Sequence, residues 1–134
     1  MNIEKLFKFI KDKRGYDYPF SYKLIKNIPL SDDELNIGGD LDLLYSDIVS
    51  LPDNLKVGRH LDLRATNITS LPDNLSVGRD CNLSHLNINS IPNNFNVYGD
   101  LFLCGNPITR KYTYREIRKM IEDKGGSVHG VIFI

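Results

Sequence analysis

The chain has 134 residues, a hydrophobic fraction of 41% and equal numbers of basic and acidic side chains, 17 of each. This length suits one domain, and the apolar fraction is too high for a disordered chain. A net charge of zero argues against a wholly basic nucleic-acid binder and against an acidic nucleic-acid mimic. The sequence contains no apolar run that could span a bilayer and no signal-peptide core, so we expect a cytoplasmic protein that does not enter the membrane.

The charged residues are unevenly distributed, and the boundaries coincide with changes in the sequence pattern. Residues 1–30 carry seven basic and three acidic side chains, residues 31–110 carry five and eleven, and residues 111–134 carry five and three. An acidic centre is therefore flanked by two basic ends. We interpret the chain as a single domain, 1–134, that is built from these three segments.

The N-terminal segment begins with a predicted helix over residues 2–13. Its apolar side chains recur at helical spacing and form one stripe: Ile3, Leu6, Phe7 and Ile10. Gly15 is a typical helix terminator. Residues 16–30 are rich in aromatic side chains, and residues 22–25 are expected to add an irregular first strand.

A repeat of 20 residues follows over residues 31–110. The sequence Leu-Pro-Asp-Asn-Leu at 51–55 recurs at 71–75 and returns as Ile-Pro-Asn-Asn-Phe at 91–95. A valine or isoleucine, a Leu-x-Leu pattern and a later isoleucine recur at the same spacing. The units are 31–50, 51–70, 71–90 and 91–110, with no insertion between them.

A unit of 20 residues cannot bury its apolar side chains alone, so the repeats are expected to stack into a solenoid. The Leu-x-Leu segment alternates with period two and predicts a short strand with one buried face. Successive strands run in the same direction and should form a parallel sheet. The Leu-Pro-Asp-Asn-Leu segment contains proline and turn-forming residues, which predict an extended stretch or a tight turn on the opposite side.

The repeat spacing, Leu-x-Leu-x-x-(Asn/Thr/Ser)-x-Ile-x-x-Leu-Pro-x-x-Leu, resembles the leucine-rich repeat. It is most similar to the short Leu-Pro type of bacterial effector proteins, and to short leucine-rich-repeat proteins of bacteria and their phages. The resemblance covers residues 31–110 and implies an α/β fold, a short leucine-rich-repeat solenoid with a parallel sheet on its concave face. The Asn-, Lys- and Ile-rich composition also suits a phage or a bacterium with an AT-rich genome.

In that family, an asparagine after the strand donates and accepts hydrogen bonds along the stack. The corresponding residues here are Ser46, Thr66, Leu86 and Asn106. Only Asn106 is the family residue, and the neighbouring Asn67 or Asn87 is left to substitute in the other units.

The C-terminal segment predicts a helix followed by a strand. Thr113 and Glu116 form a capping-box pattern that opens a helix over residues 114–124, which Gly125 and Gly126 end. Its inward side chains are expected to be Ile117, Met120 and Ile121. Residues 127–134 are apolar on both faces and are expected to pair with or seal the last repeat; the alternative is an edge that forms a weak homodimer. These elements give an N-terminal helical cap and a C-terminal helix-plus-strand cap.

The residues that flank the leucines of each predicted strand face outward on the concave side. They form the candidate partner-binding surface: Asp40, Asp42, Leu44, Tyr45, His60, Asp62, Arg64, Asp80, Asn82, His85, Asp100 and Phe102. Asp42 should lie beside Asp62, an arrangement that is unfavourable for like charges. Three interpretations remain open: a structural role with neutralisation by nearby arginines, recognition of a basic partner, or binding of a divalent cation. The spacing matches no known cation loop, so we assign no metal ligands.

The sequence contains no recognisable catalytic constellation or cofactor motif. Cys81 replaces a core leucine and is expected to be inert, and Cys104 lies too far along the strand direction to form a disulfide with it. His60, His85 and His129 follow no metal-ligand spacing, although the first two could approach each other on adjacent strands. We therefore expect a protein without a cofactor and without enzymatic activity.

The function predicted from these features is a protein–protein interaction module, a small adaptor or inhibitor that binds through its acidic and aromatic concave face. The implied partner is a protein with a basic surface, and a phage protein that blocks a host factor fits this description. The alternative is a nucleic-acid-binding protein that uses the basic caps. At the C-terminal end these basic residues are Arg110, Lys111, Arg115, Arg118 and Lys119.

Overall fold

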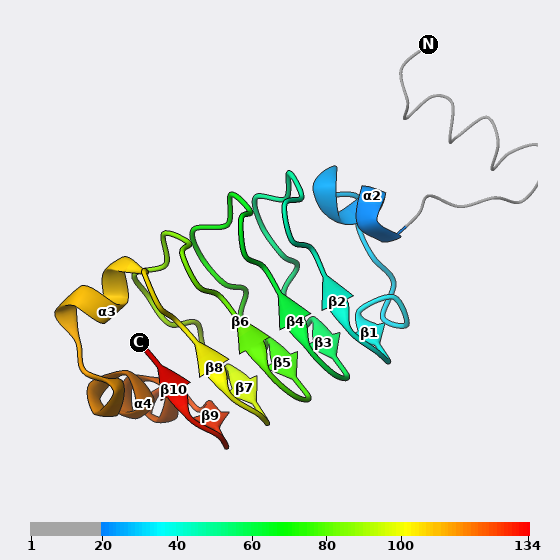
Figure 1. The fold of residues 1–134 in the computed structure, drawn as a ribbon. Helices are drawn as coiled ribbons and strands as arrows, with labels where there is room; N and C mark the ends of the chain where they lie inside the picture. The colour runs from blue at the N-terminus through cyan, green and yellow to red at the C-terminus, as the bar shows by residue number, and fades with distance from the viewer. Residues whose placement is uncertain (1–19) are drawn as a thin grey trace, which may run out of the picture.

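The chain forms a short α/β solenoid of stacked parallel strands (Figure 1). The computed structural model describes residues 20–134, and the helix expected over residues 2–13 lies outside this range. Each turn of the solenoid, here called a coil, contributes two strands of two residues each. Among the described residues, no helix is long and apolar enough to cross a membrane.

The strands form two sheets, whereas the sequence predicts only one of them. The odd-strand sheet contains β1 (Asn36–Ile37), β3 (Lys56–Val57), β5 (Ser76–Val77), β7 (Asn96–Val97) and β9 (Ser127–Val128). The even-strand sheet contains β2 (Leu41–Asp42), β4 (Leu61–Asp62), β6 (Cys81–Asn82), β8 (Leu101–Phe102) and β10 (Ile132–Phe133). Each coil contributes only one inward residue to the odd-strand sheet, such as Val57 or Val77, so no alternating pattern in the sequence reveals it.

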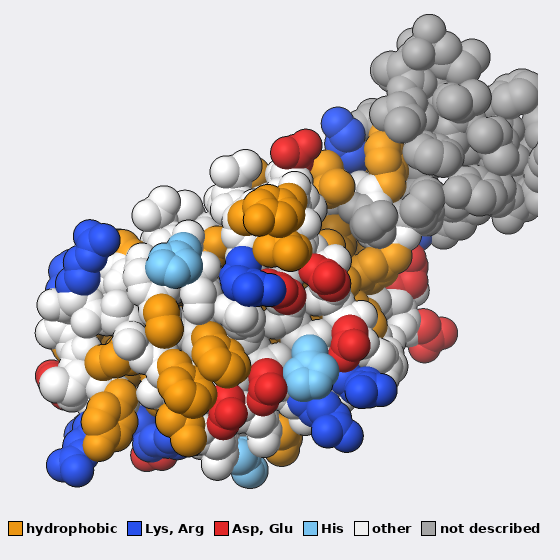
Figure 2. Space-filling view, viewed as in Figure 1, with side chains coloured by type: hydrophobic (Ala, Val, Ile, Leu, Met, Phe, Trp, Pro, Cys, Tyr) orange, Lys and Arg blue, Asp and Glu red, His pale blue; other side chains and the backbone are white. Residues whose placement is uncertain are grey.

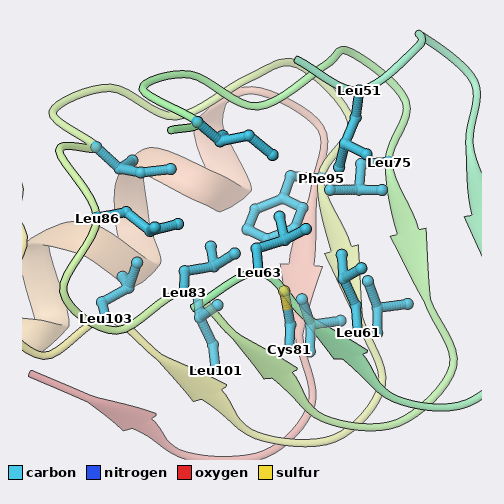
Figure 3. Close-up of a cluster of buried hydrophobic side chains, with 14 of the residues drawn as sticks. Leu51, Leu61, Leu63, Leu75, Cys81, Leu83, Leu86, Phe95, Leu101 and Leu103 are labelled. Carbon is cyan, nitrogen blue, oxygen red and sulfur yellow. The ribbon is translucent and has the colours of Figure 1, made fainter. Parts of the chain in front are cut away.

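In the first four coils, residues that are 20 positions apart in the sequence lie opposite each other in both sheets. Leu61 lies opposite Cys81, and Cys81 lies opposite Leu101. All three side chains are at most 1% exposed and point into the core, where the leucines of the second Leu-x-Leu position join them (Figure 3). The predicted vertical alignment of these side chains is therefore confirmed.

Glycines at the corner between the two sheets allow the coils to approach each other. The Gly78 N–H donates to the Val57 carbonyl at 2.8 Å. A Cβ at Gly78 would lie 2.2 Å from the carbonyl oxygen of Gly58, which is well inside the van der Waals contact distance of these atoms. The stacking distance thus excludes every side chain at this position of the third coil.

The asparagine of each Leu-Pro-x-Asn-Leu segment has a left-handed backbone, with φ between 52° and 67° at Asn54, Asn74 and Asn94. Asparagine adopts this conformation more readily than other side chains. These side chains also form a ladder, because each amide donates to the preceding one at 2.7 and 2.8 Å. The turn that these segments predict is present at residues 53–54 and at its repeats.

The segment before the first coil is helical. The expectation of a strand at residues 22–25 is wrong, because α2 (Phe20–Ile25) occupies this position. Leu24 of this helix is buried in the core, and Lys23 forms an ion pair of 2.8 Å with Glu34. The helix therefore packs on the core through Leu24 and the partly buried Phe20, and an ion pair ties it to Glu34.

Two helices follow the fourth coil. The sequence does not predict α3 (Pro107–Lys111), in which the fixed φ of Pro107 suits the first helical turn. The capping box predicted for Thr113 and Glu116 is present and opens α4 (Tyr114–Asp123). Ile117 and Ile121 are fully buried, and Met120 packs partly against the core.

The residues after α4 complete a fifth coil. Ile132 pairs with Leu101, and Val128 pairs with Val97, so residues 127–134 repeat residues 96–103 at a spacing of 31. This confirms that the C-terminal strand pairs with the last repeat. The larger spacing arises because α3 and α4 replace the short turn of the other coils.

Candidate partner-binding face

The exposed side of the even-strand sheet carries one outward residue per coil between the two buried positions. From the first coil to the fifth these residues are Asp42, Asp62, Asn82, Phe102 and Phe133. We call this side the outer face. Its composition changes along the solenoid, from acidic in the first coils to aromatic in the last two, and Figure 2 shows the acidic and hydrophobic groups side by side.

The predicted contact between the first two coils on the outer face is present, and a second lateral contact was not predicted. Asp42 lies beside Asp62 in the parallel register. At the other end, the Phe102 and Phe133 rings stack with their centroids 4.8 Å apart and their planes at 8°. Both rings remain accessible to solvent, so the stacked pair forms an exposed aromatic surface.

The outward acidic residues hold the turn that follows each strand. The Asp42 carboxylate accepts from the Leu44 N–H at 3.0 Å, and Asp62 accepts from the Arg64 N–H at 3.1 Å. The side-chain oxygen Oδ1 of Asn82 accepts the corresponding hydrogen bond from the Ser84 N–H at 3.2 Å. A short oxygen acceptor thus holds this turn in the first three coils, whereas phenylalanine takes the position in the last two.

Arg64 also neutralises the carboxylate beside it. Its guanidinium contacts Asp62 at 2.7 Å. Partial burial of Asp62 opposes ionisation, but the hydrogen bonds and charge of Arg64 outweigh this effect and hold the pKa of Asp62 below its usual value. The close approach of Asp42 and Asp62 is therefore tolerated, as expected for the structural interpretation.

A second column of side chains joins neighbouring coils. Asp40 accepts from the His60 N–H at 3.0 Å, Asp80 accepts from the Asp100 N–H at 2.8 Å, and Asp100 accepts from the Val131 N–H at 2.8 Å. His60 takes the same place in the second coil, where its Nδ1 accepts from the Asp80 N–H at 3.3 Å. This ladder explains why aspartate recurs before the first leucine. The acidic residues alone are thus no evidence for a ligand.

The other predicted surface residues lie apart from the aromatic pair. Leu44 is half-buried and Tyr45 is 79% exposed, but both belong to the first coil, about 14 Å or three strand spacings from Phe102. His85 lies against Gly105 of the next coil, and His60 lies in the aspartate column. The possible approach of His60 to His85 is therefore not observed.

Phe133, which forms half of the aromatic pair, was not among the surface residues predicted from the sequence. The signal was available in the alignment of Ser127–Ile134 with residues 96–103, where Phe133 takes the place of Phe102. Val131 and Cys104 also belong to the last two coils, and they are exposed and half-buried, respectively. The aromatic end of the outer face is thus larger than the sequence predicts.

The remaining reactive residues form no second site within residues 20–134. Burial raises the pKa of the Cys81 thiol well above its usual range, as expected for an inert core residue. No group of three or more His, Cys, Asp or Glu side chains in this part of the chain could hold a metal ion.

Acid is expected to destabilise the fold through three carboxylates. The Lys23 ammonium lowers the pKa of Glu34, the His60 N–H lowers that of Asp40, and Arg64 lowers that of Asp62. A carboxylate with a lower pKa in the folded state contributes stability above its unfolded value, which is lost as the pH falls. Urea unfolding between pH 7 and pH 3 should therefore show a decrease that begins near the usual values of 4.5 for Glu and 3.8 for Asp. Glu34→Gln should flatten this decrease, and an unchanged slope would contradict the assignment.

Comparison with protein-family models found no match, and searches of curated proteins and of solved structures likewise found no similar protein.

Proposed function

We propose that the protein is a non-enzymatic protein-binding module, and that the stacked Phe102 and Phe133 rings are the centre of its binding surface. The observation that carries this proposal is the stacking of two parallel aromatic rings on the outer face, where Phe133 is exposed and Phe102 is half-buried. Aromatic side chains of this kind dominate the binding energy of many interfaces. Exposed apolar patches on a small protein are typical of interaction surfaces.

The surroundings of the aromatic pair indicate the chemistry of the partner. Asp80 and Asp100 lie in the neighbouring column of the third and fourth coils, and Asp42 and Asp62 continue the outer face toward the first coil. A partner that places an apolar or aromatic side chain on the rings and basic side chains over these carboxylates is complementary to this surface. We therefore propose a protein partner with a basic surface.

The architecture supports a role without further domains in the described chain. In this proposal the solenoid is of the leucine-rich-repeat type, the outer face is its concave face, and the helices at both ends act as caps. Nearly all described residues belong to the scaffold or to its surface. The protein would act in the cytoplasm as a small adaptor or inhibitor, and a phage protein that blocks a host factor remains the preferred setting.

Nucleic-acid binding through the C-terminal basic residues is less well supported. The two Nη groups of Arg118 donate hydrogen bonds to main-chain carbonyls. Lys119 pairs with Asp123 at 3.0 Å, and Arg115 lies over the Tyr114 ring. Three of the five residues are thus engaged within the chain, whereas Arg110 and Lys111 are exposed.

The test is capture of partners on immobilised protein, with quantitative mass spectrometry. Proteins bound by the wild type should be lost with the double variant Phe102→Ala/Phe133→Ala and weakened by added salt. Tyr112→Ala is the matched control, since Tyr112 is 38% exposed and Phe133 is 40% exposed, but Tyr112 lies at the end of α3. If the control loses the same proteins, or if the double variant retains them, the outer face is not the binding surface. Recovery of nucleic acid instead of protein would favour the alternative.

A further inference from the structure

The last strands of the two sheets, β9 and β10, differ in what covers their outward main-chain groups. In the odd-strand sheet, the main-chain carbonyls of Val128 and Gly130 point away from the fourth coil, and Arg118 of α4 donates to both of them, with 2.8 Å to Gly130. A single side chain thus closes this edge. The even-strand sheet ends at β10 (Figure 1). Within residues 20–134, the side-chain hydrogen bonds of Arg118 reach β9 and Gly130 but not β10.

The pairing of β10 with β8 shows which main-chain N–H and C=O groups of β10 point away from β8. The Leu101 N–H donates to the Val131 carbonyl and the Leu103 N–H donates to the Phe133 carbonyl, at 2.9 and 2.8 Å. Because main-chain groups alternate in direction along a strand, the N–H and C=O of Ile132 both point away from β8, as does the Ile134 N–H. Ile132 is only 5% exposed as a whole residue, but its main chain directs one donor and one acceptor to the side away from β8.

The side chains of this edge are also incompletely covered. Ile134 takes the place of Leu103 in a column whose four leucines are at most 6% exposed, yet Ile134 is 49% exposed. Residues 127–134 contain no Asp, Glu, Lys, Arg or Pro. Natural edge strands are usually protected from pairing by a charge, a proline or a bulge, and β10 has neither charge nor proline.

We propose that β10 pairs with β10 of a second copy of this chain across a two-fold axis at Ile132. In an antiparallel pair centred on this residue, each Ile132 donates its N–H to the other and accepts in return, so the edge is its own complement. A strand without charge fits a second strand without charge, whereas the acidic outer face fits a basic partner. Pairing would join the even-strand sheets of two copies and place their Phe133 rings on one continuous face. The proposal does not rest on the proposed function of that face.

The test is the concentration dependence of the molecular mass, measured by sedimentation equilibrium. The wild type should rise from 15.3 kDa toward twice that mass. Association should be weak, with a Kd on the order of 100 μM, because the contact is small. Val131→Lys, which places like charges at the edge, should remain monomeric at all concentrations.

Val49→Lys is the control, since Val49 is 55% exposed and Val131 is 54% exposed, but Val49 belongs to the first coil. The control should associate as the wild type does. A wild type that stays at 15.3 kDa, as it would if the edge accepts a strand of another protein, overturns the proposal. Equal association of the Val131→Lys chain also overturns it. Circular dichroism of each variant separates loss of pairing from loss of the fold.

Discussion

Replacement of Phe95 by alanine should lower the free energy of unfolding by about 3–5 kcal/mol, the usual cost of deleting a buried aromatic ring. Phe95 is completely buried and lies at the centre of the core in Figure 3. It continues the column of Leu55 and Leu75, and the next residue of this column is Gly126. A Cβ at Gly126 would meet the Phe95 main chain and, at 3.0 Å, a methyl group of Ile121. The Phe95 main chain therefore packs directly against Gly126 of the fifth coil, and its buried ring is part of the core between the coils.

Chemical unfolding followed by circular dichroism measures this loss. Phe133→Ala is the control, because it deletes the same ring at an exposed position and should cost about 1 kcal/mol or less. Similar losses for the two variants would contradict the assignment of Phe95 to the core. A loss below about 1 kcal/mol for Phe95→Ala would do the same.

Asn106→Ala should cost about 2–4 kcal/mol, because it leaves two buried main-chain groups without their partner. Asn106 is completely buried, its amide donates to the Leu83 carbonyl at 2.7 Å, and its oxygen accepts from the Ile88 N–H at 2.9 Å. It thereby links the third coil to the fourth. Thermal and urea unfolding of the variant should reveal the loss.

Thr66→Ala is the matched control at the same repeat position in the second coil. The Thr66 hydroxyl donates only to the Leu63 carbonyl of its own coil, at 2.7 Å, and is not fully buried. This variant should cost about 1 kcal/mol. If Thr66→Ala is as damaging as Asn106→Ala, the link between coils is not the reason for the effect.

The asparagine position also shows what a resemblance can and cannot predict. Asn106 makes hydrogen bonds between coils of the kind that the resemblance implies for this position. Leu86, at the same position in the third coil, is instead buried in the core, and the hydroxyl of Ser46 is buried without a hydrogen-bond partner. Asn67 and Asn87 are exposed and do not take over this position. The repeat fixes where a side chain lies, but each unit fills that place with a different interaction.

The stacking of the coils could be predicted because it depends on side chains that recur at a fixed spacing. Leu61, Cys81 and Leu101 must share an environment if every coil has the same length. The second sheet escaped prediction because its strands contribute only one inward residue per coil, such as Val57 or Val77. The fifth coil escaped because 31 residues, not 20, separate Leu101 from Ile132.

The sequence predicted which residues lie on the outer face, but it did not predict the hydrogen bonds between coils or the aromatic pair. Alternation along the strand correctly placed Asp42, Asp62 and Phe102 outside the core. The bonds between coils, in which Asp80 accepts from the next main-chain N–H, depend on the turn geometry and cannot be read from spacing. The aromatic pair required the fifth coil, which the repeat of 20 did not include.

The central claim is that residues 20 positions apart lie side by side on the exposed face of one sheet. Disulfide formation between paired cysteines, measured as loss of free thiols under mild oxidation in a Cys104→Ser background, tests it directly. Asp42→Cys/Asp62→Cys should oxidise readily within one molecule, because neighbouring strands are about 4.8 Å apart. Asp42→Cys/Asn82→Cys should stay reduced, since two strand spacings of about 10 Å exceed the reach of a disulfide. Equal oxidation of both pairs, or a reduced 42/62 pair in a folded protein, would contradict the stacked solenoid.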